Sequence, residues 1–162
     1  MLASHQIARD EDEDYTDLKH LLATHQWQAA DRATAYLLLQ GAQRELEGWL
    51  RPEDIARISI HHLTTLDRLW LEFSGDRFGF SVQKQIWHET EENYTQFGDR
   101  IGWRQDDSWL NYSDLTFGLQ ANLGHLPALP LPVPLGKERV FSFVLGKWRI
   151  ALLSRQDLPH LC

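Results

Sequence analysis

Apolar residues recur at helical spacing over much of this chain. Leu18, Leu21 and Leu22 follow Thr16 at intervals of three and one, the pattern of one helix face rather than of a strand. Gly41 follows another such run at a position where helices commonly end. The segments that we expect to be helical begin at 16 and 52 and cover 29–40, 59–73, 81–89, 93–101 and 148–153.

A specified turn separates two of these helices. Gly75 and Gly79 bracket Arg77 and Phe78, and Phe80 follows directly. Glycine adopts backbone angles that other residues avoid, so two glycines this close predict a fixed turn rather than a slack linker. Because turns lie at the surface, we expect its two phenylalanine rings to be exposed.

The last third of the chain has a different character. Beyond Leu115, three glycines and four prolines predict a long loop, since proline disfavours helix interiors and central strands. An apolar run at 140–145 precedes the closing helix. Residues 103–109 are expected to form two short extended pieces joined by a tight turn.

Length and charge narrow the choice of protein class. With 162 residues the chain is long enough for one domain, so we expect a flexible acidic tail at 1–14 and one helical domain at 15–162. The formal net charge of −7 argues against nucleic acid as a partner. The single cysteine, Cys162, rules out an internal disulfide and a cysteine zinc cluster.

No segment has the composition of a targeting leader or a membrane helix. The first residues lack a basic and apolar leader, and no apolar run reaches the length of about 20 residues that crosses a bilayer. We therefore expect a soluble monomer without a transmembrane segment, with peripheral contact to a membrane left open.

The sequence gives little support to catalysis or to a protein metal site. His88-Glu89 begins as a zincin helix does, but Glu92 stands where the second histidine would be needed. No Gly-rich phosphate loop and no nucleophile elbow is present. Asp31 and Asp67 lie in helical stretches, where we expect caps or exposed pairs. The prediction is a protein that is not an enzyme.

Aromatic residues in loops are the strongest sign of a ligand. A flat, apolar and anionic molecule would need rings for its faces and guanidinium groups for its carboxylates. The alternative, which composition alone favours, is a small satellite core under a long loop. The rings are Phe78, Phe80, Phe141, Phe143 and Trp148, and the arginines near them are Arg77, Arg139, Arg149 and Arg155.

Several distinctive motifs follow one another along the chain. They are Leu66-Asp67-Arg68-Leu69-Trp70, Gly75-Asp76-Arg77-Phe78-Gly79-Phe80-Ser81-Val82-Gln83, Ile86-Trp87 and Phe97-Gly98-Asp99-Arg100-Ile101-Gly102-Trp103. Further motifs stand at 27–31, 109–112, 115–117 and 124–127. In this order they resemble a known family, the Genomes-Uncoupled-Four domain, a tetrapyrrole-binding activator of magnesium chelatase. The resemblance covers about 15–127 well and the tail less well.

This resemblance implies an all-α fold in the shape of a cupped hand, with a long loop closing an apolar cavity. Residues 129–146 would form the lid, although their proline content departs from the family pattern. Arg155, and with less support Arg149, would pair with propionates. The candidate ligand-binding residues are Phe78, Phe80, His125, Phe141, Phe143, Trp148, Arg149 and Arg155.

The implied ligand is a tetrapyrrole: protoporphyrin IX, Mg-protoporphyrin, heme or a biliverdin-type bilin. The implied partner is the large subunit of magnesium chelatase, in the cyanobacterial cytosol or the plastid stroma. The alternative is a protein-interaction module or a bilin sensor paralogue that does not activate the chelatase. An enzyme ranks third, and covalent attachment of a pigment through Cys162 stays open.

Overall fold

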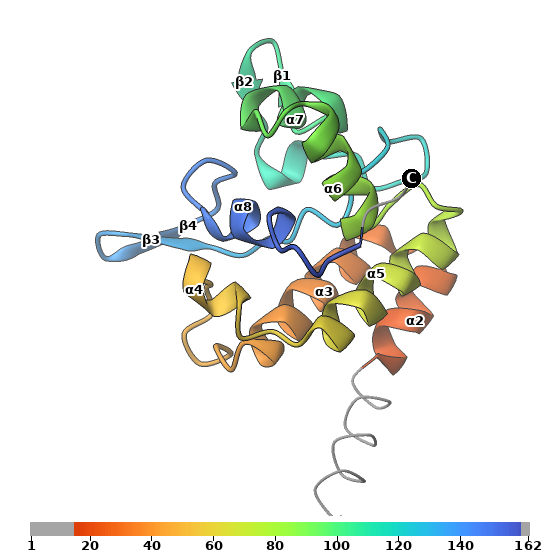
Figure 1. Cartoon of the computed structure of the whole chain (residues 1–162), viewed down its shortest axis with the longest axis horizontal. Coiled ribbons are helices and arrows are strands. Elements are labelled where there is room, and N and C mark those ends of the chain that lie inside the picture. The colour runs from red at the N-terminus through yellow and green to blue at the C-terminus, as the bar shows by residue number, and fades with distance from the viewer. Residues whose placement is uncertain (1–14, 160–162) are drawn as a thin grey trace, which may run out of the picture.

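The structure, a computed structural model, describes residues 15–159. The expected acidic tail and Cys162 lie outside these residues. Within them the fold is mostly helical, as predicted, and Figure 1 shows two small antiparallel hairpins beside the helices. The helices are α2 (Thr16–Ala23), α3 (Trp27–Gly41), α4 (Pro52–Ile55), α5 (Ile60–Ser74), α6 (Phe80–Glu89), α7 (Tyr94–Ile101) and α8 (Trp148–Leu153), with a 3-10 turn η1 (Tyr112–Asp114). The strands are β1 (Arg104–Gln105), β2 (Ser108–Trp109), β3 (Val133–Leu135) and β4 (Glu138–Val140).

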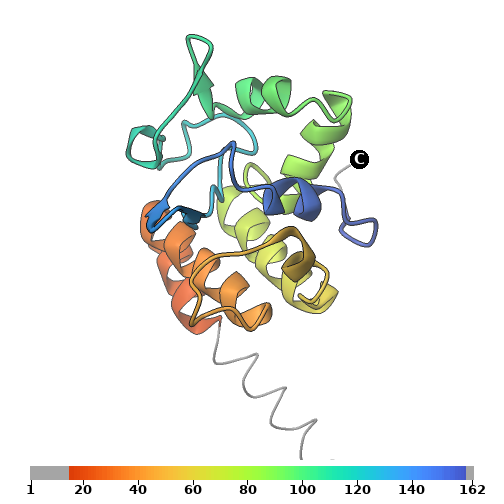
Figure 2. The ribbon, with the colours of Figure 1, turned by 90° about the vertical axis from the view of Figure 1, so that its left-hand side faces the viewer.

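Helices α2, α3 and α5 lie side by side in both ribbon views (Figures 1 and 2). Their shared core contains Trp70, whose indole Nε1 donates a hydrogen bond of 2.9 Å to Thr34 Oγ1 across two helices. Ser59 caps α5 by accepting a bond from the His62 amide. The predicted helix at 59–73 is therefore confirmed, and the structure shows that Ser59 is its N-cap.

The turn between α5 and α6 is fixed by a buried aspartate. Asp67 Oδ1 accepts from the Ser81 amide at 2.9 Å and from its hydroxyl at 3.1 Å, so a carboxylate on α5 supplies the first turn of α6 with an acceptor. At Gly79, φ is +145° and a Cβ atom would stand 2.6 Å from that carboxylate oxygen. Only glycine fits there without displacing the cap.

The second layer consists of α6, α7 and the β1–β2 hairpin. Phe97 of α7 is fully buried and makes edge contacts with Trp87 and Trp103. Strands β1 and β2 pair antiparallel, Arg104 opposite Trp109, which confirms the predicted pair of short extended pieces.

The β3–β4 hairpin and α8 complete the fold. In Figure 1 the hairpin projects at one side of the molecule above α4. Helix α8 lies between the two layers and contacts both α4 and α6. The hairpin was not predicted, because Pro134 disfavours a central strand. In a two-stranded ribbon both strands are edges, so a proline that does not donate is tolerated.

No helix within 15–159 combines the length and apolar character that a bilayer crossing requires. In the same residues, no three His, Cys, Asp or Glu side chains come together in an arrangement that could hold a metal ion.

Candidate functional site

The two phenylalanines of the α5–α6 turn lie in the core. Phe78 and Phe80 are both 0% exposed, so the expectation of exposed rings is wrong. Phe78 makes edge contacts with Trp27 at 5.6 Å and with Trp70 at 6.4 Å between ring centroids. The turn runs inward because its backbone is fastened to Asp67 and to the Leu126 carbonyl, which accepts from Gly79.

The rings that follow the hairpin pack against the second layer. Phe143 is buried and stacks on Trp103 with 4.4 Å between centroids and 16° between planes. Phe141 is half-buried and meets Phe143 edge-on at 4.9 Å. Trp148 is also buried, at the start of α8. The structure thus brings Phe141 and Phe143 into direct contact, and all three rings lie around the guanidinium of Arg149.

Arg149 is buried within this cluster. Its guanidinium lies 4.9 Å from the Phe143 ring centroid and 4.3 Å from that of Trp148. It donates hydrogen bonds to the carbonyls of Ala128 and Leu129, while its Nε has no partner among the described residues. Burial lowers the pKa of Arg149 to about 10, so the side chain stays cationic at neutral pH.

Asp31 approaches the same peptide from α3. One carboxylate oxygen accepts from the Leu129 amide at 2.8 Å, and the other accepts from the Tyr112 hydroxyl at 2.9 Å. Asp31 is 0% exposed, and this burial raises its pKa to about 6. The expectation of a cap or an exposed pair is wrong for Asp31. For Asp67 the cap is correct, since it accepts from the Ser81 amide in the first turn of α6, while exposure is not, since its side chain is buried. The signal was available, since the run at 29–40 reads as buried on most of its surface.

Arg155, just after α8, connects that segment to the end of α4 by hydrogen bonds. Its Nη1 donates to the carbonyls of Ile55 at 2.9 Å and Ile58 at 2.5 Å, while its other edge pairs with Asp157. Lys84 of α6 donates to the Arg155 and Leu158 carbonyls beside it. In this arrangement the guanidinium of Arg155 faces backbone carbonyls and Asp157.

His125 is a buried link between loops. Its Nδ1 donates to the Ile101 carbonyl at 2.7 Å, and its Nε2 accepts from the Thr116 amide at 3.0 Å. These two bonds require the neutral tautomer with its proton on Nδ1. Burial lowers the pKa of the ring, which also favours the neutral form. Both nitrogens are thereby engaged within the protein.

A cleft lies between the β3–β4 hairpin and the segment that leads into α4. We call it the hairpin cleft; its volume is about 290 Å³. Its lining is Trp49, Leu50, Arg51, Pro52, Val133, Pro134, Leu135, Leu145, Gly146 and Lys147. The lining is mainly apolar, and its two cations, Arg51 and Lys147, come from two separate segments of the chain.

Apolar side chains around this cleft are unusually open to solvent. Leu135 is 55% exposed and Leu145 is 49% exposed, and Val144 beside them is 54% exposed. A second hollow of about 330 Å³ is lined by Pro130, Leu131 and Pro132 together with Tyr36 and Tyr112. Segment 129–146 therefore leaves apolar side chains exposed and contributes to two unfilled hollows.

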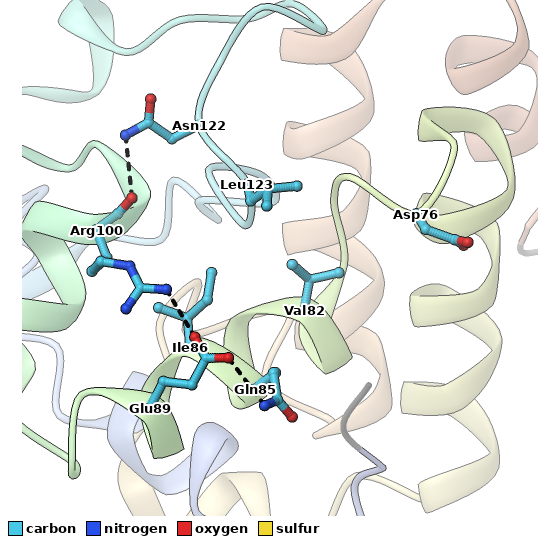
Figure 3. A pocket seen from close by; sticks show the side chains of 8 residues that line it. All are labelled: Asp76, Val82, Gln85, Ile86, Glu89, Arg100, Asn122 and Leu123. Carbon is cyan, nitrogen blue, oxygen red and sulfur yellow. Dashed lines mark hydrogen bonds and ion pairs between the residues drawn. The ribbon is translucent and has the colours of Figure 1, made fainter. Parts of the chain in front are cut away.

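A separate cavity of about 550 Å³ lies on the outer face of α6 and α7 (Figure 3). Val82, Ile86 and Leu123 point into it, and Asp76 points away at its far end. Arg100 on its wall is tied to Glu89 at 2.8 Å. Arg100 is thus neutralised by Glu89, and Asp76 adds a second acid to this lining, whereas the charged side chains that line the hairpin cleft are both cations, Arg51 and Lys147.

Comparisons with known proteins agree with this architecture. Residues 8–133 match the family described as GUN4-like. The chain is 37% identical over 117 residues to uncharacterized protein ycf53 of Porphyra purpurea, covering 70% of this chain and 49% of that protein. It is 30% identical over 122 residues to the tetrapyrrole-binding protein, chloroplastic, of Arabidopsis thaliana, covering 68% of this chain and 46% of that protein.

The fold is shared with a solved structure. The ligand-free structure of Arabidopsis thaliana GUN4 superposes with a TM-score of 0.71 at 24% identity, covering 89% of this chain and 93% of that one. The chain spans about half the length of the curated relatives that it matches. Since the family match extends over most of the sequence, this chain belongs to the GUN4-like family.

Proposed function

We propose that this chain is a non-enzymatic tetrapyrrole-binding regulator and that its ligand occupies the hairpin cleft. The observation that carries the proposal is the cleft itself, a mainly apolar space whose lining includes two cations. Membership of the GUN4-like family and the printed name of the Arabidopsis relative supply the ligand class.

The chemistry of the cleft suits a flat, apolar dianion. The Trp49 ring and the leucines at 135 and 145 offer apolar contact to a macrocycle or a linear tetrapyrrole. Arg51 and Lys147 belong to the lining and would supply N–H donors to the two propionates. Arg51 is already oriented by Asp54, which accepts two of its guanidinium N–H bonds.

The size of the cleft supports a moving lid. Ligand pockets commonly measure about 300–1,000 Å³, and the hairpin cleft, at about 290 Å³, lies just below that range. Opening residues 129–146 would join it to the hollow of about 330 Å³ that Pro130, Leu131 and Pro132 also line. In this proposal the β3–β4 hairpin forms one side of a cup, and the segment between α3 and α4 forms the other.

The predicted arginines take supporting roles in this proposal. Arg149 binds the base of the lid and Arg155 binds α4, so each positions one wall of the cleft. Their direct contact with propionates stays a prediction, as does ligand contact by the five predicted rings and His125. The large subunit of magnesium chelatase stays the proposed partner, by family resemblance alone.

Titration of the purified protein tests the proposal. Protoporphyrin IX, Mg-protoporphyrin, heme and biliverdin are added in turn while pigment absorbance and tryptophan fluorescence are followed. At least one is expected to give a saturable shift with quenching, because Trp49 lines the cleft. No saturable change with any of the four would refute the proposal.

Charge variants locate the ligand. Arg51→Ala combined with Lys147→Ala is expected to weaken affinity about tenfold or more, the scale of one lost charged hydrogen bond. The matched control is Arg100→Ala, which removes a cation from the cavity of Figure 3 and is expected to leave affinity unchanged. The opposite pattern would move the ligand to that cavity.

A further inference from the structure

The base of the lid is held by two buried charged side chains from different helices. Asp31 of α3 accepts from the Leu129 amide at 2.8 Å, and Arg149 of α8 donates to the Leu129 carbonyl at 2.7 Å. Arg149 also donates to the carbonyl of Ala128. One residue at the start of the lid is therefore bonded through its amide and its carbonyl at once.

The backbone at this point is strained. Leu129 has φ of +62°. This left-handed conformation is unfavourable for a bulky residue such as leucine, and it persists only where the surrounding contacts stabilise it. The residues just before it are fixed to α6, since Gln83 donates to the carbonyls of Gly124 and Pro127 at 2.9 Å each. Leu129 is thus where the anchored chain ends and the lid begins.

Burying two charged side chains costs free energy. Here that cost is offset by the bonds that Asp31 and Arg149 make to the backbone of Ala128 and Leu129. Arg149 Nε is buried without a partner within 15–159, so the guanidinium is not fully satisfied in the closed arrangement. These features are typical of a junction that is held in one position rather than of a passive core.

We infer that Asp31 and Arg149 form a clamp on Leu129 that positions the lid, and that this clamp sets how tightly the hairpin cleft closes on its ligand. The inference rests on the proposed function for the ligand. The positioning of the lid itself is a property of the protein alone. Tyr112 completes the clamp, because its hydroxyl donates to the second oxygen of Asp31.

The charged and titratable groups around Asp31 determine the effect of pH. Tyr112 faces it from η1 and Arg149 from α8, while Arg32 lies beside Tyr112 and Tyr94 faces Arg149 from α7. Burial is the largest influence on Asp31 and raises its pKa to about 6, despite the bonds and the cation that oppose it. Opening the lid would hydrate the carboxyl and return its pKa towards about 4.

The direction of the pH effect on lid closure follows from the two pKa values of Asp31, about 6 when the lid is closed and about 4 when it is open. A carboxyl whose pKa is higher in the closed state favours closure when it is protonated, so closure is most stable below pH 4. That advantage is lost as the pH rises through about 6, where Asp31 ionises in the closed state. The lid should therefore open more readily at pH 8 than at pH 5.

Two substitutions at one position act in opposite directions. Asp31→Asn keeps an oxygen acceptor for the Leu129 amide and removes the buried charge, so it should hold the lid closed at every pH. Asp31→Ala removes the acceptor and should release the lid. The matched control is Asp67→Asn, another buried helical aspartate that accepts from a backbone amide but lies at the α5–α6 turn.

Hydrogen exchange of the full chain, read by mass spectrometry for peptides within 130–146 and corrected for the intrinsic rate, tests the clamp. The wild-type lid should exchange about tenfold faster at pH 8 than at pH 5. Asp31→Asn should abolish that difference, Asp31→Ala should speed exchange at both pH values, and Asp67→Asn should leave the ratio unchanged.

The protoporphyrin IX dissociation rate, measured in parallel, should follow the same order. Lid exchange that is the same in both Asp31 variants and the wild type would overturn the clamp, even if the pigment binds. Exchange that responds as stated while no pigment binds would support the clamp and refute the proposed function instead.

Discussion

Phe143→Ala distinguishes packing from ligand binding at the lid. Phe143 is 2% exposed, stacks on Trp103 and lies under the Arg149 guanidinium. Removing such a ring from a packed site costs about 3–5 kcal/mol. Because small domains have about 5–15 kcal/mol of stability in total, this one change should remove a large part of it.

Urea unfolding measures the loss directly. The midpoint should fall with an unchanged slope, since the surface exposed on unfolding hardly changes. Phe141→Ala is the matched control, because this ring belongs to the same segment but is half-buried, and it should cost about 1–2 kcal/mol. A loss below about 1 kcal/mol for Phe143→Ala, together with loss of pigment quenching, would show that the ring serves the ligand and not the fold.

Two further substitutions test the supports of the cleft and the turn. Gly79→Ala should cost at least about 1–3 kcal/mol in thermal or urea unfolding, because φ of +145° and the Asp67 oxygen at 2.6 Å exclude a Cβ atom; a neutral result would mean that the turn relaxes freely. Arg155→Ala should cost about 1.5–3 kcal/mol through the orphaned Ile55 and Ile58 carbonyls, with a smaller effect on pigment affinity. A tenfold loss of affinity at full stability would instead make Arg155 a direct propionate partner.

The helices could be predicted because local signals agree with tertiary burial. Ser59 caps the helix that its apolar stripe predicts, and Asn93 accepts from the Gln96 amide at the start of α7. Pro52 stands in the first turn of α4, as its fixed φ favours. In each case one short stretch of sequence contains both the start of the helix and the face that it buries.

Long-range polar contacts could not be predicted from local pattern. Asp31 meets Leu129 across a separation of 98 residues, and Arg155 meets Ile55 across 100. A carboxylate in a helix has the same local signature whether it caps, faces solvent or binds a distant amide. Only the folded arrangement shows which of these applies.

The aromatic residues illustrate the same limit. Phe78 and Phe80 were assigned to an exposed turn because they stand between glycines, yet the cap at Asp67 draws that turn into the core. Phe141 and Phe143 were assigned together, and the structure does bring them together, with Arg149 between their rings and the lid base. The residue types were enough to predict an aromatic cluster. They could not predict where a ligand would bind, because the proposed cleft is lined by the β3–β4 hairpin.

The location of the ligand is the central claim, and amide and indole chemical-shift mapping on the isotopically labelled protein tests it most directly. Saturation with the tetrapyrrole that binds in the titration should shift the Trp49 indole signal and the amides of Val133, Leu135 and Lys147, the lining of the hairpin cleft. Signals of Val82, Ile86 and Arg100 should stay in place. Shifts confined to that second set, or no saturable shift in either, would contradict the account.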